Sequence, residues 1–343
     1  MAPTDVHGLV PIHFFAWNLP QSEQIQLIQT LASTQIKVLR IFIATIDSKQ
    51  AGSNAMGADD LERYQVGKYD DNVLNQIDQL IVNLAKYGNG MKLIIALHDR
   101  YSLGCYAYKR DAYTDKYQIP AAQSCSPPND ASNFYTNSQA RQDMYIRARH
   151  ILTHVNPYYN RQWGSLSQAI FSIQIENESQ GHMNKYTSDW LCDLSIRIRP
   201  LVSNGVLLSS GGGTEFGNSL RLEYFQCKAL DLIGLHDYTT NYNFAVSKVK
   251  EAVQLAQTYG KRVYVEEFGD RGDKQMESAL NSVAYAAHGN GVPWVIWQVV
   301  PNARWNDFEF FTQQTLAWAA FRHQANSASG SPSPWSWPEI WGA

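Results

Sequence analysis

The sequence predicts an α/β protein that folds as a single (β/α)8 TIM barrel. Two observations support this prediction. Short runs rich in β-branched residues alternate with longer segments of helical periodicity, and eight such strand–helix units follow one another along the chain. A doubly wound sheet fits less well, because its first strand is usually followed by a glycine-rich turn, whereas residues 14–20 read FFAWNLP.

The expected strands are short apolar runs, and the segments between them carry apolar residues at three- and four-residue spacing. We expect strands near residues 9–16, 36–43, 91–97, 169–176, 205–209, 230–235, 262–266 and 292–299. The clearest helical segments are 22–33, 72–87, 138–155 and 243–260. Gly88 and Gly260 stand at the ends of two of these helices, where we expect the left-handed conformation of a C-cap.

The composition is that of an ordinary globular protein and argues against several functional classes. Of the 343 residues, 44% are hydrophobic and 17% are charged, and the net charge of −3 gives no reason to expect a nucleic-acid partner. No apolar run approaches the ~20 residues that span a bilayer, so we expect no membrane partner. Ten Trp and nineteen Tyr residues favour a carbohydrate ligand without requiring one, since aromatic faces pack against sugar rings.

We expect one catalytic domain over residues 1–343, acting as a monomer. Its C-terminal tail, 327–343, is rich in Pro, Ser and Trp, and is expected either to pack back on the barrel or to fray. The sequence begins MAPTDVHG, without the apolar segment of a signal peptide, and a mature secreted chain with an added Met would look the same. Extracellular localisation is therefore an expectation that depends on the cysteines.

The four cysteines form an even set. Cys105 and Cys125 flank one loop, and Cys192 and Cys227 fall in two successive helical segments. We expect two disulfides, Cys105–Cys125 and Cys192–Cys227, in a secreted protein, and the alternative is four free thiols in a cytosolic one.

Polar or aromatic side chains stand at the ends of most expected strands, where barrel enzymes place their chemistry. In chain order they are Trp17-Asn18, Arg40, His98-Asp99, Glu176-Asn177-Glu178, His236-Asp237-Tyr238, Glu266-Glu267 and Trp297-Gln298. The long connections 44–70 and 99–137 also follow strands, so we expect them at the same face as substrate-binding loops. Any one of these groups is equally well explained as a solvated loop residue, but the whole set is not.

The fourth and seventh expected strands both deliver carboxylates, which is the arrangement that glycoside hydrolysis needs. One carboxyl group must be protonated to donate to the leaving oxygen, and the other must be ionised to attack the anomeric carbon. We expect Arg40 to keep its neighbouring carboxylate ionised and Tyr238 to donate a hydrogen bond to it. Asn177 is placed to bind a sugar hydroxyl, and Trp297 to lie under a sugar ring. Each of these residues also has a purely structural alternative. Arg40 would then form a core ion pair, Tyr238 would be a packed aromatic, and Trp297 would plug the barrel.

The chain resembles the clan A retaining glycoside hydrolases, and within them the endo-β-1,4-mannanase group of family 5. The resemblance covers most of the chain, and its motifs are VLRIF at 38–42, AIFSIQIENE at 169–178, HDY at 236–238, RVYVEEFG at 262–269 and Trp297. Each string is weak alone, but their order along the strands of one barrel is specific.

The resemblance implies Glu178 as the acid/base and Glu267 as the nucleophile. It also implies substrate-binding or supporting roles for Arg40, His98, Asn177, His236, Tyr238 and Trp297. Further aromatic residues are expected to contribute to sugar subsites, namely Trp17, Tyr106, Tyr108, Tyr242 and Trp305.

The chain departs from the mannanase pattern at Glu176, where an apolar residue is usual. Strand alternation predicts that Glu176 and Glu178 face the same way. A buried Glu176 then needs a partner such as an Arg or a protonated neighbour, or it raises the pKa of Glu178 by like-charge repulsion. Glu266 and Glu267 raise the same question, because alternation allows only one of them to face the barrel mouth, and the resemblance favours Glu267.

We therefore expect a retaining O-glycosyl hydrolase that needs no cofactor and no metal, with β-mannan as its first candidate substrate. β-Glucan or β-galactan substrates remain open, as does exo rather than endo action. A metal-dependent barrel hydrolase is disfavoured because His13, His98, Asp99 and His236 do not form a convincing ligand set. A non-catalytic sugar-binding barrel is disfavoured because both strand-end carboxylates are present.

Overall fold

The computed structural model describes residues 4–6, 10–34, 36–106, 109–120, 130–183, 185–203, 205–300, 308–310 and 315–341. Its centre is a curled parallel sheet of six strands in the order β10-β9-β8-β7-β4-β3. The strands are β3 Val38–Phe42, β4 Lys92–Ala96, β7 Ile170–Gln174, β8 Leu207–Ser209, β9 Leu232–His236 and β10 Arg262–Glu267. A separate parallel pair is formed by β2 Val10–Pro11 and β11 Val295–Ile296.

Isolated parallel bridges lie between this pair and the two edges of the sheet. Ile12, which follows β2, bridges to Arg40 of β3, and Trp294, which precedes β11, bridges to Val265 of β10. Each of the eight expected strand regions therefore contains a strand. The first and the last of them are only two residues long.

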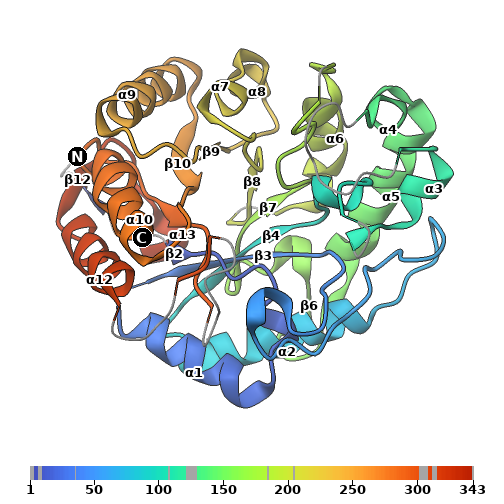
Figure 1. Ribbon diagram of the computed structural model, residues 1–343. Coiled ribbons are helices and arrows are strands. Elements are labelled where there is room, and N and C mark those ends of the chain that lie inside the picture. Colours follow the sequence, from blue (N-terminus) through green and yellow to red (C-terminus); the bar gives the residue numbers. More distant parts are fainter. Residues whose placement is uncertain are drawn as a thin grey trace.

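Helices surround the sheet on its outside (Figure 1). The longer ones are α1 Gln21–Ala32, α2 Asn72–Tyr87, α5 Ser138–Thr153, α6 Trp190–Ile198, α9 Tyr242–Tyr259, α10 Asp273–Ala279 and α12 Leu316–Ala328. Short helices are α3 Ala112–Lys116, α4 Ser132–Thr136, α7 Phe216–Ser219, α8 Leu222–Gln226, α11 Tyr285–His288 and α13 Pro338–Trp341, and a π-helical turn spans Leu280–Ala284. The four helices expected from periodicity are α1, α2, α5 and α9.

The two predicted glycine caps differ. Gly260 ends α9 in the left-handed conformation, with φ 65°, as expected. Gly88 ends α2 with φ −90°, so that prediction is wrong, and the positive φ angles fall on Asn89 and Gly90 instead. A side chain at position 88 would still be excluded, because its Cβ would lie 2.6 Å from the carbonyl oxygen of Leu84. The glycine there permits a close approach rather than a left-handed turn.

The strands are buried on both faces, and polar side chains lie among them. All five residues of β3, β7 and β9 are buried. Gln174 of β7 donates to the hydroxyl of Tyr264 on β10 at 3.0 Å, and that hydroxyl lies 2.9 Å from Oγ of Ser209 on β8. Buried polar groups are stable only when hydrogen-bonded, so this network fixes the strands below the pocket described next.

The cysteine prediction is confirmed where the structure describes it. Cys192 on α6 is bonded to Cys227, which follows α8, over a sequence separation of 35 residues. A disulfide that closes a loop of this size raises the free energy of unfolding by roughly 3–4 kcal/mol. Cys105 is also disulfide-bonded, and Cys125, its expected partner, lies outside the described residues.

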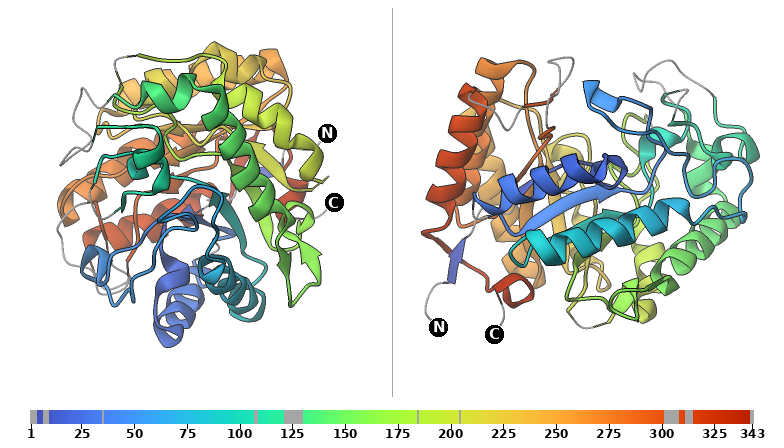
Figure 2. Two further views of the ribbon diagram at one scale, coloured as in Figure 1. Left: turned by 90° about the vertical axis from the view of Figure 1, so that its right-hand side faces the viewer. Right: turned by 90° about the horizontal axis from the view of Figure 1, so that it is seen from below.

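The C-terminal tail packs against the rest of the chain. Its strand β12, Ser331–Ser333, pairs antiparallel with β1, Thr4–Val6, at the side of the molecule where both chain ends lie (Figure 2). Trp337 is buried, and Glu339 of α13 forms a 2.8 Å ion pair with Arg262 at the start of β10.

A small antiparallel hairpin, β5 Val155–Asn156 with β6 Arg161–Gln162, follows α5. Among the helices that the structure describes, none combines the length and apolar character needed to cross a membrane.

Candidate active site

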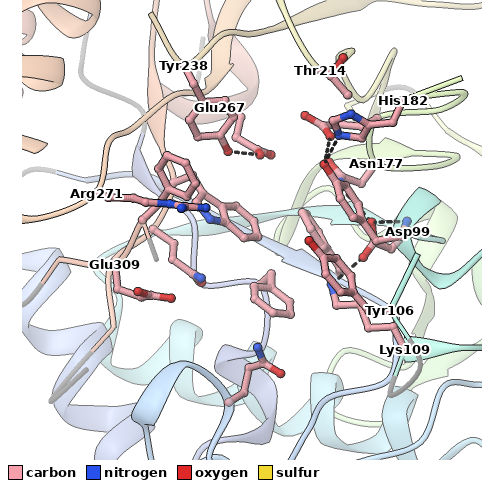
Figure 3. A pocket seen from close by; sticks show the side chains of 18 residues that line it. Asp99, Tyr106, Lys109, Asn177, His182, Thr214, Tyr238, Glu267, Arg271 and Glu309 are labelled. Carbon is pink, nitrogen blue, oxygen red and sulfur yellow. Dashed lines mark hydrogen bonds and ion pairs between the residues drawn. The ribbon is translucent and has the colours of Figure 1, made fainter. Parts of the chain in front are cut away.

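A pocket of about 460 Å³ lies at the C-terminal ends of the strands (Figure 3). It contains residues from the ends of β4, β7, β9 and β10 and from the loops that follow them. The lining residues are Phe14, Phe42, Gln50, Asp99, Tyr101, Tyr106, Lys109, Asn177, Glu178, His182, Thr214, Tyr238, Glu267, Arg271, Trp297, Gln298, Phe308 and Glu309.

The chain changes course just after β7. Asn177 continues the parallel pairing through its N–H, which donates to the carbonyl of His98 at 2.9 Å. Glu178 then adopts a left-handed backbone with φ 48°, and its N–H donates to Gly211 at 3.0 Å. As a result the adjacent side chains of Asn177 and Glu178 both line the pocket, and Glu176 does not. The expectation that Glu176 and Glu178 face the same way is therefore wrong, because strand alternation ends with β7 at Gln174.

Glu176 is instead paired beneath the loops. One carboxylate oxygen lies 2.7 Å from Nδ1 of His98, and the other accepts from the hydroxyl of Tyr135 at 2.7 Å. The second ring nitrogen of His98 lies 2.7 Å from Asp111. Burial alone would lower the pKa of His98, but hydrogen bonds to Asp111 and Glu176 raise it to about 10. Glu176 thus has the protonated neighbour that its burial requires, and His98 supports the site from outside the pocket.

Two adjacent glutamates at the end of β10 point in different directions. The register of β10 against β9 shifts between Val265 and Glu267, and Glu267 lines the pocket. Glu266 is buried below it, with its carboxylate against the hydroxyl of Tyr264 and 3.2 Å from Nε2 of His236. Gly234 on β9 leaves room for this carboxylate, since a Cβ there would lie 1.9 Å from it. Burial would raise the pKa of Glu266, but the charges of Arg40 and His236 hold it below its usual value.

Arg40, fully buried on β3, connects the two strand ends. Its guanidinium donates to Glu267 at 2.8 Å, to the side-chain oxygen of Asn177 at 2.7 Å and to Gln174 at 3.1 Å. The amide nitrogen of Asn177 in turn donates to Asp99 at 3.1 Å. Asn177 is therefore held from both ends of its amide, and among the described residues one N–H of its side chain is left for a further acceptor.

The carboxylate of Glu267 receives a second donor, the hydroxyl of Tyr238. Burial raises the pKa of Glu267, and the nearby charge of Glu178 adds to this effect. The charges of His236 and Arg40 and the hydrogen bond from Tyr238 act in the opposite direction. Because Arg40 binds one oxygen and Tyr238 the other, the ionised form of Glu267 is the one that these contacts fit.

Glu178 faces Glu267 across the pocket. One of its oxygens lies 2.9 Å from Nδ1 of His236, and the other lies 2.7 Å from the hydroxyl of Tyr101. An oxygen of Glu178 and one of Glu267 are within 4.8 Å of each other. Two carboxyl groups this close resist simultaneous ionisation, and the charge of Glu178 accordingly acts to raise the pKa of Glu267.

His236 lies between the carboxylates. Its Nδ1 faces Glu178, its Nε2 faces Glu266, and Glu267 lies 3.5 Å from Nδ1. Burial would lower its pKa, but the charge of Glu267 and hydrogen bonds to Glu178 and Glu266 raise it to about 9. Near neutral pH both ring nitrogens therefore carry hydrogens. Glu178, His236 and Glu267 are close enough to surround a metal ion, but both ring nitrogens of His236 already lie within hydrogen-bond distance of carboxylates, with Nδ1 facing Glu178 and Nε2 facing Glu266.

Aromatic rings line one side of the pocket. Trp297, half-buried, stacks on Phe14 with 5.3 Å between ring centroids and on Phe42 with 5.8 Å. The ring centroids of Phe308 and Tyr238 lie 4.7 Å apart. The flat, partly exposed face of Trp297 is the kind of surface that packs against a sugar ring.

The remaining predicted subsite residues are distributed unevenly. Tyr106 lines the pocket and stacks on Tyr101 at 5.8 Å. Trp17 does not line it, because this residue is buried and its indole N–H donates to the carbonyl of Phe42 at 3.0 Å. Tyr242 lies on the surface at the start of α9, where its ring is 5.7 Å from that of Tyr285, and does not line the pocket either. Trp305 and Tyr108 lie outside the described residues.

Several pocket residues were not singled out from the sequence. The loop after β4 adds Tyr101 and Lys109 to the predicted Asp99 and Tyr106, and Figure 3 shows Tyr106 and Lys109 opposite Arg271 and Glu309. The one available signal for Tyr101 and His182 is their position two to four residues after the polar strand ends. That signal is too weak to select them individually.

Comparisons with known proteins identify the family and the fold of the chain. A family model described as "GH family 5 beta-mannosidase-like" matches residues 21–287. No curated protein sequence matches the chain significantly. Similar solved structures include the endo-1,4-beta-mannanase from Rhizomucor miehei, with a TM-score of 0.74, 16% identity and coverage of 96% of this chain and 98% of that chain.

Two further structures share the fold. The endo-beta-1,4-mannanase from Thermotoga petrophila has a TM-score of 0.70 and 14% identity, covering 97% of this chain and 79% of its own. The glycoside hydrolase family 5 mannosidase from Rhizomucor miehei has a TM-score of 0.67 and 14% identity, covering 95% and 93%. At such identities the structural likeness establishes the fold, and the family model establishes the relationship. The chain belongs to glycoside hydrolase family 5, as a member of its β-mannosidase-like group.

Proposed function

We propose that this protein is a retaining β-mannan hydrolase that works by double displacement, with Glu178 and Glu267 as its two catalytic residues. The observation that carries the proposal is the approach of these two carboxylates to within 4.8 Å in one pocket. Retaining glycosidases place their carboxyl groups about 5–5.5 Å apart, whereas inverting enzymes need about 6.5–9.5 Å to admit a water molecule.

In the first step, the carboxyl group of Glu178 donates its proton to the glycosidic oxygen as the bond from that oxygen to the anomeric carbon breaks. The carboxylate of Glu267 forms a bond to the same carbon. Arg40 and Tyr238 hold Glu267 ionised and oriented for this attack, and Asn177 is placed beside the sugar hydroxyl next to the reacting carbon.

In the second step, Glu178 is ionised and takes a proton from a water molecule. The water oxygen bonds to the anomeric carbon, and the bond to Glu267 breaks. His236 keeps a positive charge beside both carboxyl groups through the two steps, which stabilises the negative charge as it moves between them. Trp297 supports the sugar ring.

β-Mannan is the preferred substrate class, with endo action on β-1,4 linkages. The resemblance of the strand-end motifs and the names of two structural neighbours, both endo-mannanases, support this choice. A β-mannosidase that releases single sugars is the second candidate, because the matching family is described as β-mannosidase-like and one neighbour is a mannosidase.

The same proposal extends to the architecture and location. The bridges at Ile12 and Val265 support closure of the eight parallel strands into one (β/α)8 barrel, and the packed tail supports a single domain over residues 1–343. The disulfides support secretion, since such bonds persist in oxidising compartments. We propose that the protein acts as an extracellular monomer on a carbohydrate.

A product assay on β-mannan, mixed-linkage β-glucan, cellulose and β-galactan tests the substrate. The proposal expects mixed manno-oligosaccharides early in the reaction with β-mannan, and little release from the other polymers. Mannose alone from the first time point would identify the second candidate. Hydrolysis of glucan or galactan in preference to mannan would overturn the proposed specificity.

A further inference from the structure

Tyr101 stands between Glu178 and a histidine that the reaction scheme does not use. Its hydroxyl lies 2.7 Å from one carboxylate oxygen of Glu178 and 3.0 Å from Nε2 of His182. A tyrosine hydroxyl has one hydrogen, so Tyr101 cannot donate to both neighbours at once. When Glu178 takes this hydrogen, His182 cannot, and when Glu178 carries a proton of its own, the hydrogen is available to Nε2 of His182.

The backbone is arranged to bring His182 back toward the pocket. Glu178, Gln180 and His182 all have positive φ angles, of 48°, 62° and 55°, a conformation that residues other than glycine rarely adopt. The turn is closed by the N–H of Gly181, which donates to Glu178 at 2.8 Å, and by Arg100, whose Nε donates to Gly181 at 3.1 Å. Clusters of such outliers occur where a functional geometry is maintained against local preference.

Tyr101 is fixed independently of His182. Its backbone N–H donates to Asp99 at 3.3 Å, its ring stacks on Tyr106 at 5.8 Å, and Nζ of Lys109 lies 5.8 Å from the ring centroid. Burial raises the pKa of Tyr101 well above its usual value, and the charge of Glu178 adds to this, so the hydroxyl keeps its hydrogen. Tyr101 is thus a neutral group at a fixed place, and only the orientation of its O–H bond can change.

The charged groups around Glu178 determine where its proton resides. Glu267 faces it from β10, His236 from β9, and Asp99 and Lys109 lie beside Tyr101 after β4. Both oxygens of Glu267 are bound by donors, which leaves Glu178 as the carboxyl group that carries the proton for the proposed acid step.

The oxygen of Glu178 that carries this proton follows from the remaining contacts. One oxygen receives a hydrogen from Nδ1 of His236, which leaves the other oxygen, the one that faces Tyr101, for the proton. With Glu178 protonated there, Tyr101 accepts from Glu178 and gives its own hydrogen to Nε2 of His182.

We propose that Tyr101 and His182 are positioning residues that keep the acid proton on Glu178, with His182 acting through Tyr101 as the acceptor at the end of the chain. This inference rests on the acid/base role proposed for Glu178. When Glu178 passes its proton to the leaving oxygen, the O–H of Tyr101 turns from His182 to the new carboxylate. When Glu178 takes a proton from water, the O–H turns back, so the cycle conserves every proton.

The proposed roles of Tyr101 and His182 predict the direction in which His182→Phe shifts the titration midpoint of Glu178. In His182→Phe the acceptor is gone, so Tyr101 donates to Glu178 permanently and stabilises its ionised form. We expect the proton affinity of Glu178 to fall about tenfold, which is one pH unit in its titration midpoint. His182→Gln offers an amide oxygen as an acceptor and is expected to stay close to the wild type. In a Tyr101→Phe background, His182→Phe is expected to have no effect on the midpoint.

The test is a carbon-13 NMR titration of the glutamate carboxyl groups of the full chain, with the Glu178 signal assigned from Glu178→Gln. His182→Leu is titrated in parallel, so that poor folding of one variant does not decide the result. Equal midpoints in wild type, His182→Phe and His182→Leu would overturn the proposal, as would a shift that persists without the Tyr101 hydroxyl. The titration needs no turnover, so a wild type that cleaves no β-mannoside would contradict the proposed function while this result remained readable.

Discussion

The ends of β7 and β10 are built from the same parts and arranged in opposite ways. Each presents one glutamate to the pocket, Glu178 or Glu267, and buries another beside it, Glu176 or Glu266. Glu267 belongs to its strand and is bound by the permanent charge of Arg40. Glu178 lies on a left-handed turn beyond its strand, and where Glu267 has Arg40 and Tyr238 as partners it has His236 and Tyr101.

This difference separates two chemical tasks. A guanidinium does not release its charge at any physiological pH, so it favours the ionised form of the carboxylate that it binds, which is the form that the proposed nucleophile needs. A hydroxyl can both donate and accept, so the carboxyl group beside it can exchange a proton without losing its partner. Each carboxylate thus has one cationic and one tyrosine partner, and the two ends differ in that the hydroxyl beside Glu178 also lies 3.0 Å from Nε2 of His182.

The largest effect is expected for Glu267→Ala. Loss of the nucleophile is predicted to lower kcat roughly 10⁶-fold, the scale seen when an enzyme loses its attacking group. Added azide is predicted to restore turnover of an activated aryl β-mannoside and to give a product of inverted configuration, identified by proton NMR. Glu266→Ala is the matched control, and an azide product of inverted configuration from that variant instead would reverse the assignment of the two residues.

A smaller loss, which depends on the leaving group, is expected for Glu178→Ala. General acid catalysis contributes roughly 10²–10⁴-fold, and an aryl leaving group of low pKa does not need it. We predict slow cleavage of β-mannan and rapid formation of the glycosyl-enzyme from a dinitrophenyl β-mannoside, seen as a burst in stopped-flow absorbance. Equal losses on both substrates would contradict the acid role.

Replacement of Arg40 by Met tests the fixed charge at the β10 end. Removal of one charge-assisted donor is expected to cost roughly 10²–10³-fold in kcat. The charge of Arg40 lowers the pKa of Glu267, so its loss raises that pKa, and the acidic limb of the profile of kcat/KM against pH moves to higher pH. Arg40→Lys keeps a positive charge without the forked geometry of a guanidinium. Its kcat and the position of its acidic limb are expected to lie between those of the wild type and those of Arg40→Met. An unmoved acidic limb in Arg40→Met would sink this account of Glu267.

The residue pairs buried beneath the pocket are expected to affect stability rather than turnover. The pKa of His98 is raised from its usual 6.5 to about 10, so its stabilising contribution is fully present below pH 6.5 and is lost as pH rises through 10. We predict that Tm of the wild type falls over this range more steeply than Tm of His98→Gln, measured by calorimetry. Parallel curves for the two proteins would mean that His98 is neutral in the fold.

The smallest effect is expected for Glu176→Gln. His98 lies between Asp111 and Glu176 and compensates the charge of Glu176, which does not line the pocket. We therefore predict that the limbs of the pH–rate profile move by less than about 0.3 units, since a shift of one unit corresponds to about 1.4 kcal/mol of interaction. A larger shift of the limb assigned to Glu178 would mean that the charge of Glu176 acts on Glu178 by repulsion, which was the alternative role for a glutamate at this position.

The sequence predicts the strands and the pocket carboxylates for one physical reason. Strands buried on both faces read as continuous apolar runs, and the polar residues that end them mark the catalytic face. Glu178 and Glu267 could therefore be placed at one face from sequence, together with Asn177 and Tyr238. The parallel neighbours of a strand are distant in sequence, so which residues meet across that face depends on the fold as a whole.

Local backbone departures account for what could not be predicted. The orientation of Glu176 was missed because regular alternation stops at Gln174, before the polar residues begin. His182 was missed because three left-handed residues carry it back toward the pocket, and no residue type in that turn announces them. Trp17 resembles a subsite aromatic at a strand end, but its indole N–H finds a partner inside the core.

The division of labour between the two strand ends is tested most directly by trapping the covalent intermediate. A 2-deoxy-2-fluoro-β-mannosyl fluoride forms a glycosyl-enzyme that hydrolyses slowly, because the fluorine destabilises the cationic transition state. Intact-protein mass spectrometry is predicted to show addition of one fluorosugar, and peptide mapping to locate it on Glu267. A label on Glu266 or Glu178 would contradict the account.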